Sequence, residues 1–223
     1  MEADNTSGSD VHRERELPDS AHTEMNGGIS EEDMLRTQLY GLLARSLAEP
    51  PSDETLEILR GLADADDGTD IGKALSTLGV LAVRTPRGHA EDEFTKLFYG
   101  MGAGGELTPS ASFYLTGFVY EKPLSELRAD LTELGVGVSG LNKEPEDHIA
   151  FLCETMYGLI TGDLGSGIGL AGQRDFFQKH IAPWVVRFFE DLEGAEAAAL
   201  YMPLGTVGKI FMAVEAEAFE MAA

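Results

Sequence analysis

The sequence predicts an all-α protein that folds as a single-domain helical bundle. Apolar residues recur at three- and four-residue spacing in segment after segment, and no stretch shows the alternation that is typical of a β-strand. The chain has 223 residues, 43% of them apolar, which is enough for one domain with a sizeable core. No internal repeat interrupts this pattern.

The chain is predicted to divide into a disordered acidic tail over residues 1–29 and an all-helical domain over residues 30–223. The tail is rich in Ser, Gly, Asp and Glu and has few apolar anchors. Ser30 suits the N-cap of the first helix because acidic residues fill the turn that follows it. The stripe predicted to face the core consists of Leu35, Leu39, Leu42 and Leu43.

Three more helices are predicted before the middle of the chain. The segment "PPS" ends the first helix, and Ser52 begins another with an apolar side. Helical periodicity then runs from Ile71 to Val83 and again over residues 89–99. The apolar side of the helix that begins at Ser52 consists of Leu56, Leu59 and Leu62. The apolar side of the helix over 89–99 consists of Phe94, Leu97 and Phe98.

The second half is predicted to hold short helical turns at 109–118 and 123–134, and then longer helices. A Gly-rich loop over 162–172 precedes "QRDFFQKHIAPWVVRFFEDL", a helix that Pro183 should kink. The last helix begins near Pro203, a residue suited to a first helical turn. Its expected apolar residues are Val207, Ile210, Phe211, Val214 and Phe219.

The charge and cysteine content exclude several functions. A formal net charge of −23 argues against nucleic acids and anionic membranes as partners, whereas it suits a basic partner. The single cysteine, Cys153, allows no intrachain disulfide and no Cys-rich metal site. Without an apolar run of about 18 residues or a secretory signal, we expect no membrane insertion and a cytoplasmic location.

The sequence contains no complete enzyme motif, so we predict no catalytic residue, no cofactor and no metal. Gly100, Gly102 and Gly105 form G-x-G-x-x-G, but a helical segment precedes them where a dinucleotide loop needs a strand, which favours a connector. The chain lacks the Glu-x-x-His pairs of di-iron bundles and the G-x-S-x-G elbow of hydrolases. Glu144 and His148 have helical i, i+4 spacing but no evident third ligand.

The segment "LNKEPEDHIAFLCETMYGLI" (141–160) concentrates carboxylates at the start of an apolar helix. With Pro145 as the first helical residue, Glu144 lies near the cap and Glu146 and Asp147 in the first turn. Such carboxylates either cap the helix or bind a ligand. Asp147 and His148 are expected at the border between the core and a surface groove. The predicted core stripe is Ile149, Leu152, Met156, Leu159 and Ile160.

Three segments in order resemble the TorD/DmsD/NarJ family of molybdoenzyme maturation chaperones. These are "FTKLFYGMGAGGELTPSASFYL", "EPEDHIAFL", which carries the family's Glu-Pro-x-Asp-His signature, and "HIAPWVVRFFEDL". The opening "LYGLLARSLAEPPSDETLEIL" is similar to the family's first helix pair. The resemblance covers about 30–220 and implies the TorD-like helical bundle.

The resemblance also implies a function. Such proteins are cytoplasmic chaperones that bind the precursor of a molybdopterin-containing oxidoreductase, usually at its N-terminal twin-arginine signal, and hold it until the cofactor is inserted. By position in the family's motifs and from the acidic cluster, the candidate signal-peptide-binding residues are Glu144, Pro145, Glu146, Asp147, His148, Phe94, Leu97, Phe98, Pro109, Ser112 and Tyr114.

These residues suggest a groove in which carboxylates beside exposed aromatic residues meet two guanidinium groups and an apolar run. Whether His148 contacts the peptide or only positions Asp147 stays open. Two other functions stay open as well: an assembly subunit for a nitrate-reductase-like enzyme that is not exported, and a guanine-nucleotide-binding switch, although the phosphate-loop motif of such switches is absent. Neither the client enzyme nor the choice between a monomer and a helix-swapped homodimer follows from the sequence.

Overall fold

The computed structural model of the chain describes residues 30–100, 104–137, 144–165 and 168–222. These residues form α-helices and one π-helical turn and contain no strand, which confirms the all-α prediction. The tail predicted over 1–29 lies outside the described residues. The elements are α1 (Glu31–Ala48), α2 (Asp53–Arg60), α3 (Asp70–Arg84), α4 (Arg87–Phe94), η1 (Thr95–Tyr99), α5 (Ala111–Thr116), α6 (Lys122–Glu133), α7 (Ile149–Thr161), α8 (Leu170–His180), α9 (Val185–Gly194) and α10 (Tyr201–Met221).

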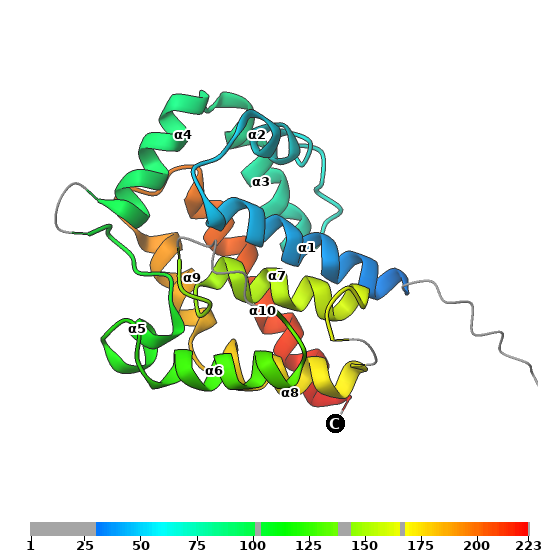
Figure 1. Cartoon of the computed structure of the whole chain (residues 1–223). Helices are drawn as coiled ribbons and strands as arrows, with labels where there is room; N and C mark the ends of the chain where they lie inside the picture. Colours follow the sequence, from blue (N-terminus) through cyan, green and yellow to red (C-terminus); the bar gives the residue numbers. More distant parts are fainter. Residues whose placement is uncertain (1–29, 101–103, 138–143, 166–167, 223) are drawn as a thin grey trace, which may run out of the picture.

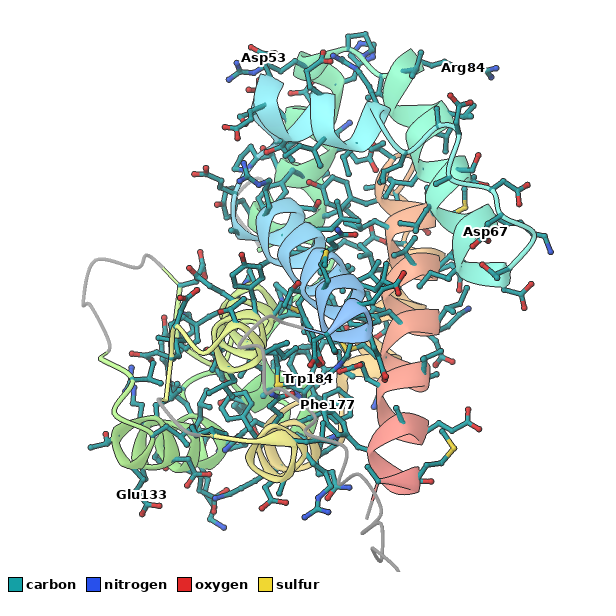
Figure 2. The ribbon with its side chains drawn as sticks, turned by 90° about the vertical axis from the view of Figure 1, so that its right-hand side faces the viewer. Asp53, Asp67, Arg84, Glu133, Phe177 and Trp184 are labelled. Carbon is teal, nitrogen blue, oxygen red and sulfur yellow. The ribbon has the colours of Figure 1, made fainter. Side chains whose placement is uncertain are left out.

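The helices are arranged around a central pair. α1 packs along α7 in the middle of the molecule, with α2, α3 and α4 on one side and α5, α6 and α8 on the other (Figure 1). α10 runs past both groups and packs against α9 and α3 (Figures 1 and 2). The part of the chain that the structure describes has no helix that is both long and apolar enough to cross a membrane.

Two predicted helix starts, at Ser30 and Ser52, are confirmed at their N-caps. The Ser30 hydroxyl accepts the backbone N–H of Asp33 at 3.0 Å, so α1 begins where the acidic turn indicated. The Ser52 hydroxyl accepts the N–H of Thr55 at 3.1 Å and starts α2. Each cap supplies a partner to an N–H group that has none within its helix, which favours these starting points by about 1 kcal/mol.

The core confirms most of the predicted apolar stripes. On α7, Ile149, Leu152 and Met156 are fully buried, and Leu159 and Ile160 nearly so. Cys153 is also fully buried there. Leu56 and Leu59 of α2 face the same core, which continues across α9 and α10 through Phe188, Phe189, Val207, Phe211 and Phe219.

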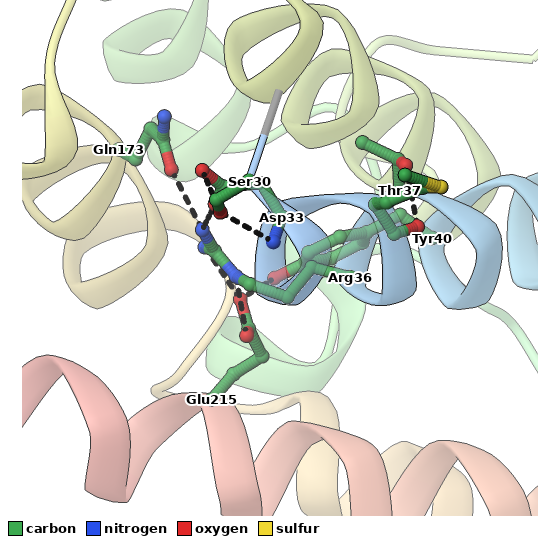
Figure 3. A network of polar contacts seen from close by, with 8 residues as sticks. Ser30, Asp33, Arg36, Thr37, Tyr40, Gln173 and Glu215 are labelled. Atoms are coloured by element: carbon green, nitrogen blue, oxygen red, sulfur yellow. Dashed lines mark hydrogen bonds and ion pairs between the residues drawn. The ribbon is translucent and has the colours of Figure 1, made fainter. Parts of the chain in front are cut away.

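The buried face of α1 differs from the prediction. Leu35, expected in the core, is 58% exposed, whereas the neighbouring Arg36 is buried. The Arg36 guanidinium donates to both carboxylate oxygens of Glu215 on α10, at 2.8 and 2.9 Å, and to Gln173 on α8 at 3.0 Å (Figure 3). Near its start, α1 therefore meets α8 and α10 through polar groups.

The helix predicted to kink at Pro183 is instead two helices. α8 ends at His180 and α9 begins at Val185. Proline has no N–H and disfavours the helical conformation of the residue before it. Trp184, which follows the proline, is buried, and its indole N–H donates to the His180 carbonyl at 2.9 Å. In α10, which begins at Tyr201, Val214 is exposed rather than buried.

Candidate functional site

The acidic segment ahead of α7 is not helical, contrary to prediction. α7 begins at Ile149, and its N-cap is His148, whose Nδ1 accepts the N–H of Ala150 at 3.2 Å. The Pro145 carbonyl accepts the His148 N–H at 3.0 Å, which closes a turn just before the helix. Pro145 therefore lies in that turn instead of at the first helical position, because an imidazole supplies the cap one turn later.

Asp147 is fully buried, which contradicts its expected place at the border of a groove. Its Oδ2 atom accepts the N–H of Ser112 at 2.8 Å, and its backbone carbonyl accepts the N–H of Ala111 at 3.0 Å. Both donors lie in the first turn of α5, so Asp147 caps a helix from another part of the chain. Its second carboxylate oxygen, Oδ1, is buried and has no hydrogen-bond partner among the residues that the structure describes.

The other residues of the signature have different roles. Glu146 is buried and forms an ion pair with Arg128 of α6, with oxygen–nitrogen distances of 2.7 and 2.9 Å. His148 is buried as well, and burial lowers the pKa of its imidazole to about 4. A neutral ring is what the cap requires, since a protonated Nδ1 cannot accept. Glu144 is exposed and Pro145 partly so.

Residues 109–112, which hold two of the candidate binding residues, run directly against the Glu-Pro-x-Asp-His signature. Pro109 is buried, and its carbonyl accepts the N–H of Ile149 at 2.9 Å. Ser112 is fully buried, and its hydroxyl accepts the N–H of Glu121 at 3.3 Å. The structure therefore brings the predicted site residues at 109–112 and at 147–148 together, through buried contacts.

The apolar residues Phe94, Leu97 and Phe98, expected to be exposed in a groove, lie mostly in the core. Phe94 is 1% exposed and Leu97 is fully buried, whereas Phe98 is only partly buried. The ring centroids of Phe94 and Phe98 lie 4.8 Å apart, and both rings contact Tyr201 of α10. Tyr201, the first residue of α10, therefore covers part of this aromatic stripe.

The exposed edge of this aromatic cluster is Tyr99, which is 45% exposed and packs on Phe94 with centroids 5.3 Å apart. Partial burial raises the pKa of the Tyr99 hydroxyl, and the negative charges of Glu144 and Glu49 raise that pKa further. Two exposed carboxylates therefore lie near one exposed aromatic ring. We call Glu49, Phe98, Tyr99 and Glu144 the acidic–aromatic surface.

Tyr114 lines a pocket of about 380 Å³ between α5 and α9. Its hydroxyl donates to Asp191 at 2.9 Å. Burial and this carboxylate raise the pKa of Tyr114 well above its usual range. Arg187 also lines the pocket, beside the apolar walls of Leu107 and Phe113.

The segment after Ser112 carries exposed apolar side chains that sequence reasoning missed. It lies in and just beyond the short helix α5, and Phe118 and Tyr120 are each 69% exposed. The one available signal was the string "FYLTGFVY", which is apolar without any helical period. We call Phe113, Leu115, Phe118, Val119 and Tyr120 the apolar segment.

Among the described residues, no group of three or more His, Cys, Asp or Glu side chains could hold a metal ion. Burial raises the pKa of the Cys153 thiol far above its usual range, which keeps it protonated. The π-helical η1 leads into Gly100 where a dinucleotide loop would need a strand, and residues 101–103 of that motif lie outside the described residues.

Comparison with known proteins gives consistent results. A model of the family described as nitrate reductase delta subunit matches residues 64–190, more than half of the chain. The TorD chaperone of Vibrio cholerae is 27% identical over 180 residues, 77% of this chain and 81% of that protein. The TorD chaperone of Vibrio parahaemolyticus is 25% identical over 176 residues, 75% of this chain and 73% of that protein.

A solved structure shares the fold. It is a protein from Archaeoglobus fulgidus described as a redox enzyme maturation protein, with a TM-score of 0.53 and 21% identity over 80% of this chain and 94% of that one. The matching residues, 64–190, contain most of the motifs that suggested the resemblance. The chain therefore belongs to the nitrate reductase delta subunit family, the TorD/NarJ group, whose members are maturation chaperones rather than enzymes.

Proposed function

We propose that the chain is a cytoplasmic chaperone dedicated to one molybdopterin-containing oxidoreductase. It binds the N-terminal twin-arginine signal of the precursor and holds the enzyme for folding and cofactor insertion before export or assembly. The observation that carries this proposal is the family match over residues 64–190, which includes the Glu-Pro-x-Asp-His signature at Glu144–His148. The net charge of −23 suits a basic client segment.

The exposed residues suggest where each part of the signal binds. The acidic–aromatic surface offers Glu49 and Glu144 to guanidinium groups and the Tyr99 ring for stacking. Residues 106–112 connect the acidic–aromatic surface to the apolar segment. At one end the Leu107 N–H donates to the Leu97 carbonyl at 2.8 Å, and at the other the Ala111 N–H donates to the Asp147 carbonyl. A basic and then apolar peptide matches this order.

The energies assign different tasks to the two surfaces. An exposed ion pair contributes only about 0.2–1 kcal/mol. Burying about 300–400 Å² of apolar surface contributes roughly 8–10 kcal/mol before the cost of ordering the peptide is subtracted. The apolar contacts would therefore supply affinity, and the carboxylates would supply orientation and the preference for arginine.

Titration of a labelled twin-arginine signal peptide tests this placement. The combined variant Glu144→Gln, Tyr99→Ala should weaken binding about tenfold, because it removes one carboxylate and the ring beside it. The matched control is Glu217→Gln, Tyr157→Ala, which removes an exposed carboxylate and a similarly exposed ring from α10 and α7. The control should bind like the wild type.

A peptide with Lys-Lys in place of Arg-Arg completes the test. Wild type should prefer the Arg-Arg peptide, because guanidinium is planar, donates two parallel hydrogen bonds and stacks on an aromatic ring. The combined variant Glu144→Gln, Tyr99→Ala should lose that preference. Equal binding by the wild type, the combined variant and the control would mean that the acidic–aromatic surface takes no part in binding the signal peptide. Absence of binding to any twin-arginine peptide would contradict the proposed function itself.

The matching family model favours a second candidate function, because it is described as nitrate reductase delta subunit. In this alternative the chain assembles a nitrate-reductase-like enzyme that is not exported, and the bound client segment lacks paired arginines. Replacing Arg-Arg by Lys-Lys in the full-length client separates the two: unchanged complex formation supports assembly without an export signal, and loss of the complex supports the first proposal.

A further inference from the structure

Ser112 holds both ends of the apolar segment. Its backbone N–H donates to Asp147 just before the segment begins, and its hydroxyl accepts the N–H of Glu121 just after the segment ends. Ser112 is itself fully buried. Between these two contacts, Tyr120 has a backbone φ of 62°, a value that non-glycine residues rarely adopt. The exposed side chains are thus held on a loop closed at its base.

Asp147 anchors that base. It supplies acceptors to two consecutive N–H groups of α5, those of Ala111 and Ser112. Its Oδ1 atom is buried and has no hydrogen-bond partner among the described residues, so the contacts that Asp147 makes there are those of Oδ2 and of its carbonyl. With no exposed surface, the carboxylate does not reach a peptide on the outside of the molecule.

We infer that Asp147 is a positioning residue: acting through Ser112, it holds the apolar segment in the shape that receives the uncharged apolar run of the client signal. The inference rests on the proposed function for the identity of the occupant. It assigns the signature aspartate a role different from direct contact with arginine, for which the exposed Glu144 is better placed.

The occupant follows from chemistry and continuity. The apolar segment exposes aromatic and aliphatic side chains next to the pocket lined by Phe113 and Tyr114. It is joined to the acidic–aromatic surface by residues 106–112, a span of about 20 Å if extended. An extended peptide whose arginines contact Glu144 would thus place its following residues near the apolar segment.

Three labelled peptides test the inference: a twin-arginine signal with its apolar run, the same peptide with that run replaced by serines, and a Lys-Lys version. Two affinity ratios are measured. The first is the affinity for the peptide with the apolar run divided by that for the serine peptide, and the second is the affinity for the Arg-Arg peptide divided by that for the Lys-Lys peptide. Asp147→Ala should reduce the first ratio about tenfold, as expected for loss of a charged hydrogen bond at the base of the segment, and leave the second unchanged. Asp147→Asn should restore most of the first ratio, because the amide oxygen still accepts from Ser112.

Hydrogen exchange gives a readout that needs no peptide. In Asp147→Ala the amides of 113–121 should exchange about tenfold faster, while those of the α7 core keep their wild-type rates. If Asp147→Ala does not fold, Ser112→Ala provides both readouts, with a smaller change of about threefold because only the bond to Glu121 is lost.

Two results would overturn the inference. A collapse of the Arg-Arg over Lys-Lys ratio in Asp147→Ala would show that this carboxylate recognises arginine. Wild-type exchange over 113–121 would show that Asp147 does not hold the segment. If the wild type binds none of the three peptides, the proposed function fails, whereas the exchange rates still decide whether Asp147 positions the segment.

Discussion

Arg36 shows how a single side chain can set the orientation of a helix. A helical pattern built from leucines places Leu35 inside, yet the guanidinium beside it is inside because Glu215, 179 residues later in the chain, completes its hydrogen bonds. A buried charge is tolerated only with such a partner. The spacing of residues along α1 carries no information about a carboxylate on α10, so this contact could not be predicted from the sequence.

Asp147 shows the same limit at the candidate site. The pattern left capping and ligand binding open for the carboxylates of 144–148, and the structure has Asp147 capping α5 rather than its own helix. Local spacing indicated that a carboxylate would meet helix N–H groups. Which helix supplies those N–H groups depends on the packing of residues 109–112 against 147–149, which only the fold determines.

His148 makes the stability of the domain sensitive to acid. Its pKa in the folded state is about 4, below the usual 6.5, because burial disfavours the charged ring. The unfolded chain thus binds the proton first, and stability from this group is complete above pH 6.5 and is lost as pH falls toward 4. The free energy of unfolding should fall by about 2–3 kcal/mol more in wild type than in His148→Asn between pH 7 and pH 4.5, measured by urea denaturation.

Asparagine is the suitable replacement because it also caps helices and does not titrate. The two proteins should therefore have similar free energies of unfolding at pH 7, and the wild type should be the less stable of the two at pH 4.5. Parallel pH profiles for wild type and His148→Asn would mean that the imidazole does not titrate below its usual range in the folded state.

At the scale of helices, the features set by local chemistry were predictable. Ser30 and Ser52 cap α1 and α2 as expected, and the stripe of α7 is buried throughout. The predictions that were wrong concern places where two elements pack against each other. Pro183 ends the helical run, so α8 and α9 are separate helices, and the buried Trp184 indole donates to the His180 carbonyl. Phe94 and Leu97 are buried in the core instead of lining a groove, and Phe94 packs on Tyr201 at the start of α10.

The close approach of α9 and α10 depends on glycine. A Cβ atom at Gly205 would lie 2.7 Å from the backbone nitrogen of Glu193 and 2.9 Å from the carbonyl oxygen of Phe189, so one of the helices would have to move. Gly205→Ala should lower the free energy of unfolding by about 1–3 kcal/mol, although alanine favours a helix by about 1 kcal/mol over glycine. Urea denaturation measures the change.

Gly88 in α4 is the matched control, because nothing lies within 4 Å of a Cβ atom there and its φ is not positive. Gly88→Ala should raise the free energy of unfolding by about 0.5–1 kcal/mol through helix propensity alone. The same substitution, glycine to alanine, should thus lower the free energy of unfolding at position 205 and raise it at position 88. Stabilisation by Gly205→Ala would contradict the tight contact between α9 and α10.

At the scale of the whole molecule, net charge affects folding and binding in opposite directions. The chain has 39 acidic and 16 basic residues, and folding brings this excess of negative charge closer together. The ion pairs are mostly at the surface, such as Arg87 with Asp53 and Lys122 with Glu126, where each contributes little. The acidity that suits a basic client thus destabilises the free chaperone.

Salt should therefore stabilise the fold and weaken the complex, because dissolved ions screen both repulsion within the chain and attraction to the peptide over about 10 Å at 0.1 M. Between 0.05 and 0.5 M NaCl, the free energy of unfolding in urea should rise by about 1 kcal/mol, while the affinity for the twin-arginine peptide falls several-fold. A peptide with citrulline in place of both arginines keeps the shape without the charge, and its affinity should change little. Equal salt dependence of the two peptides would mean that the client is recognised by its apolar run alone, with no part played by Glu49 and Glu144.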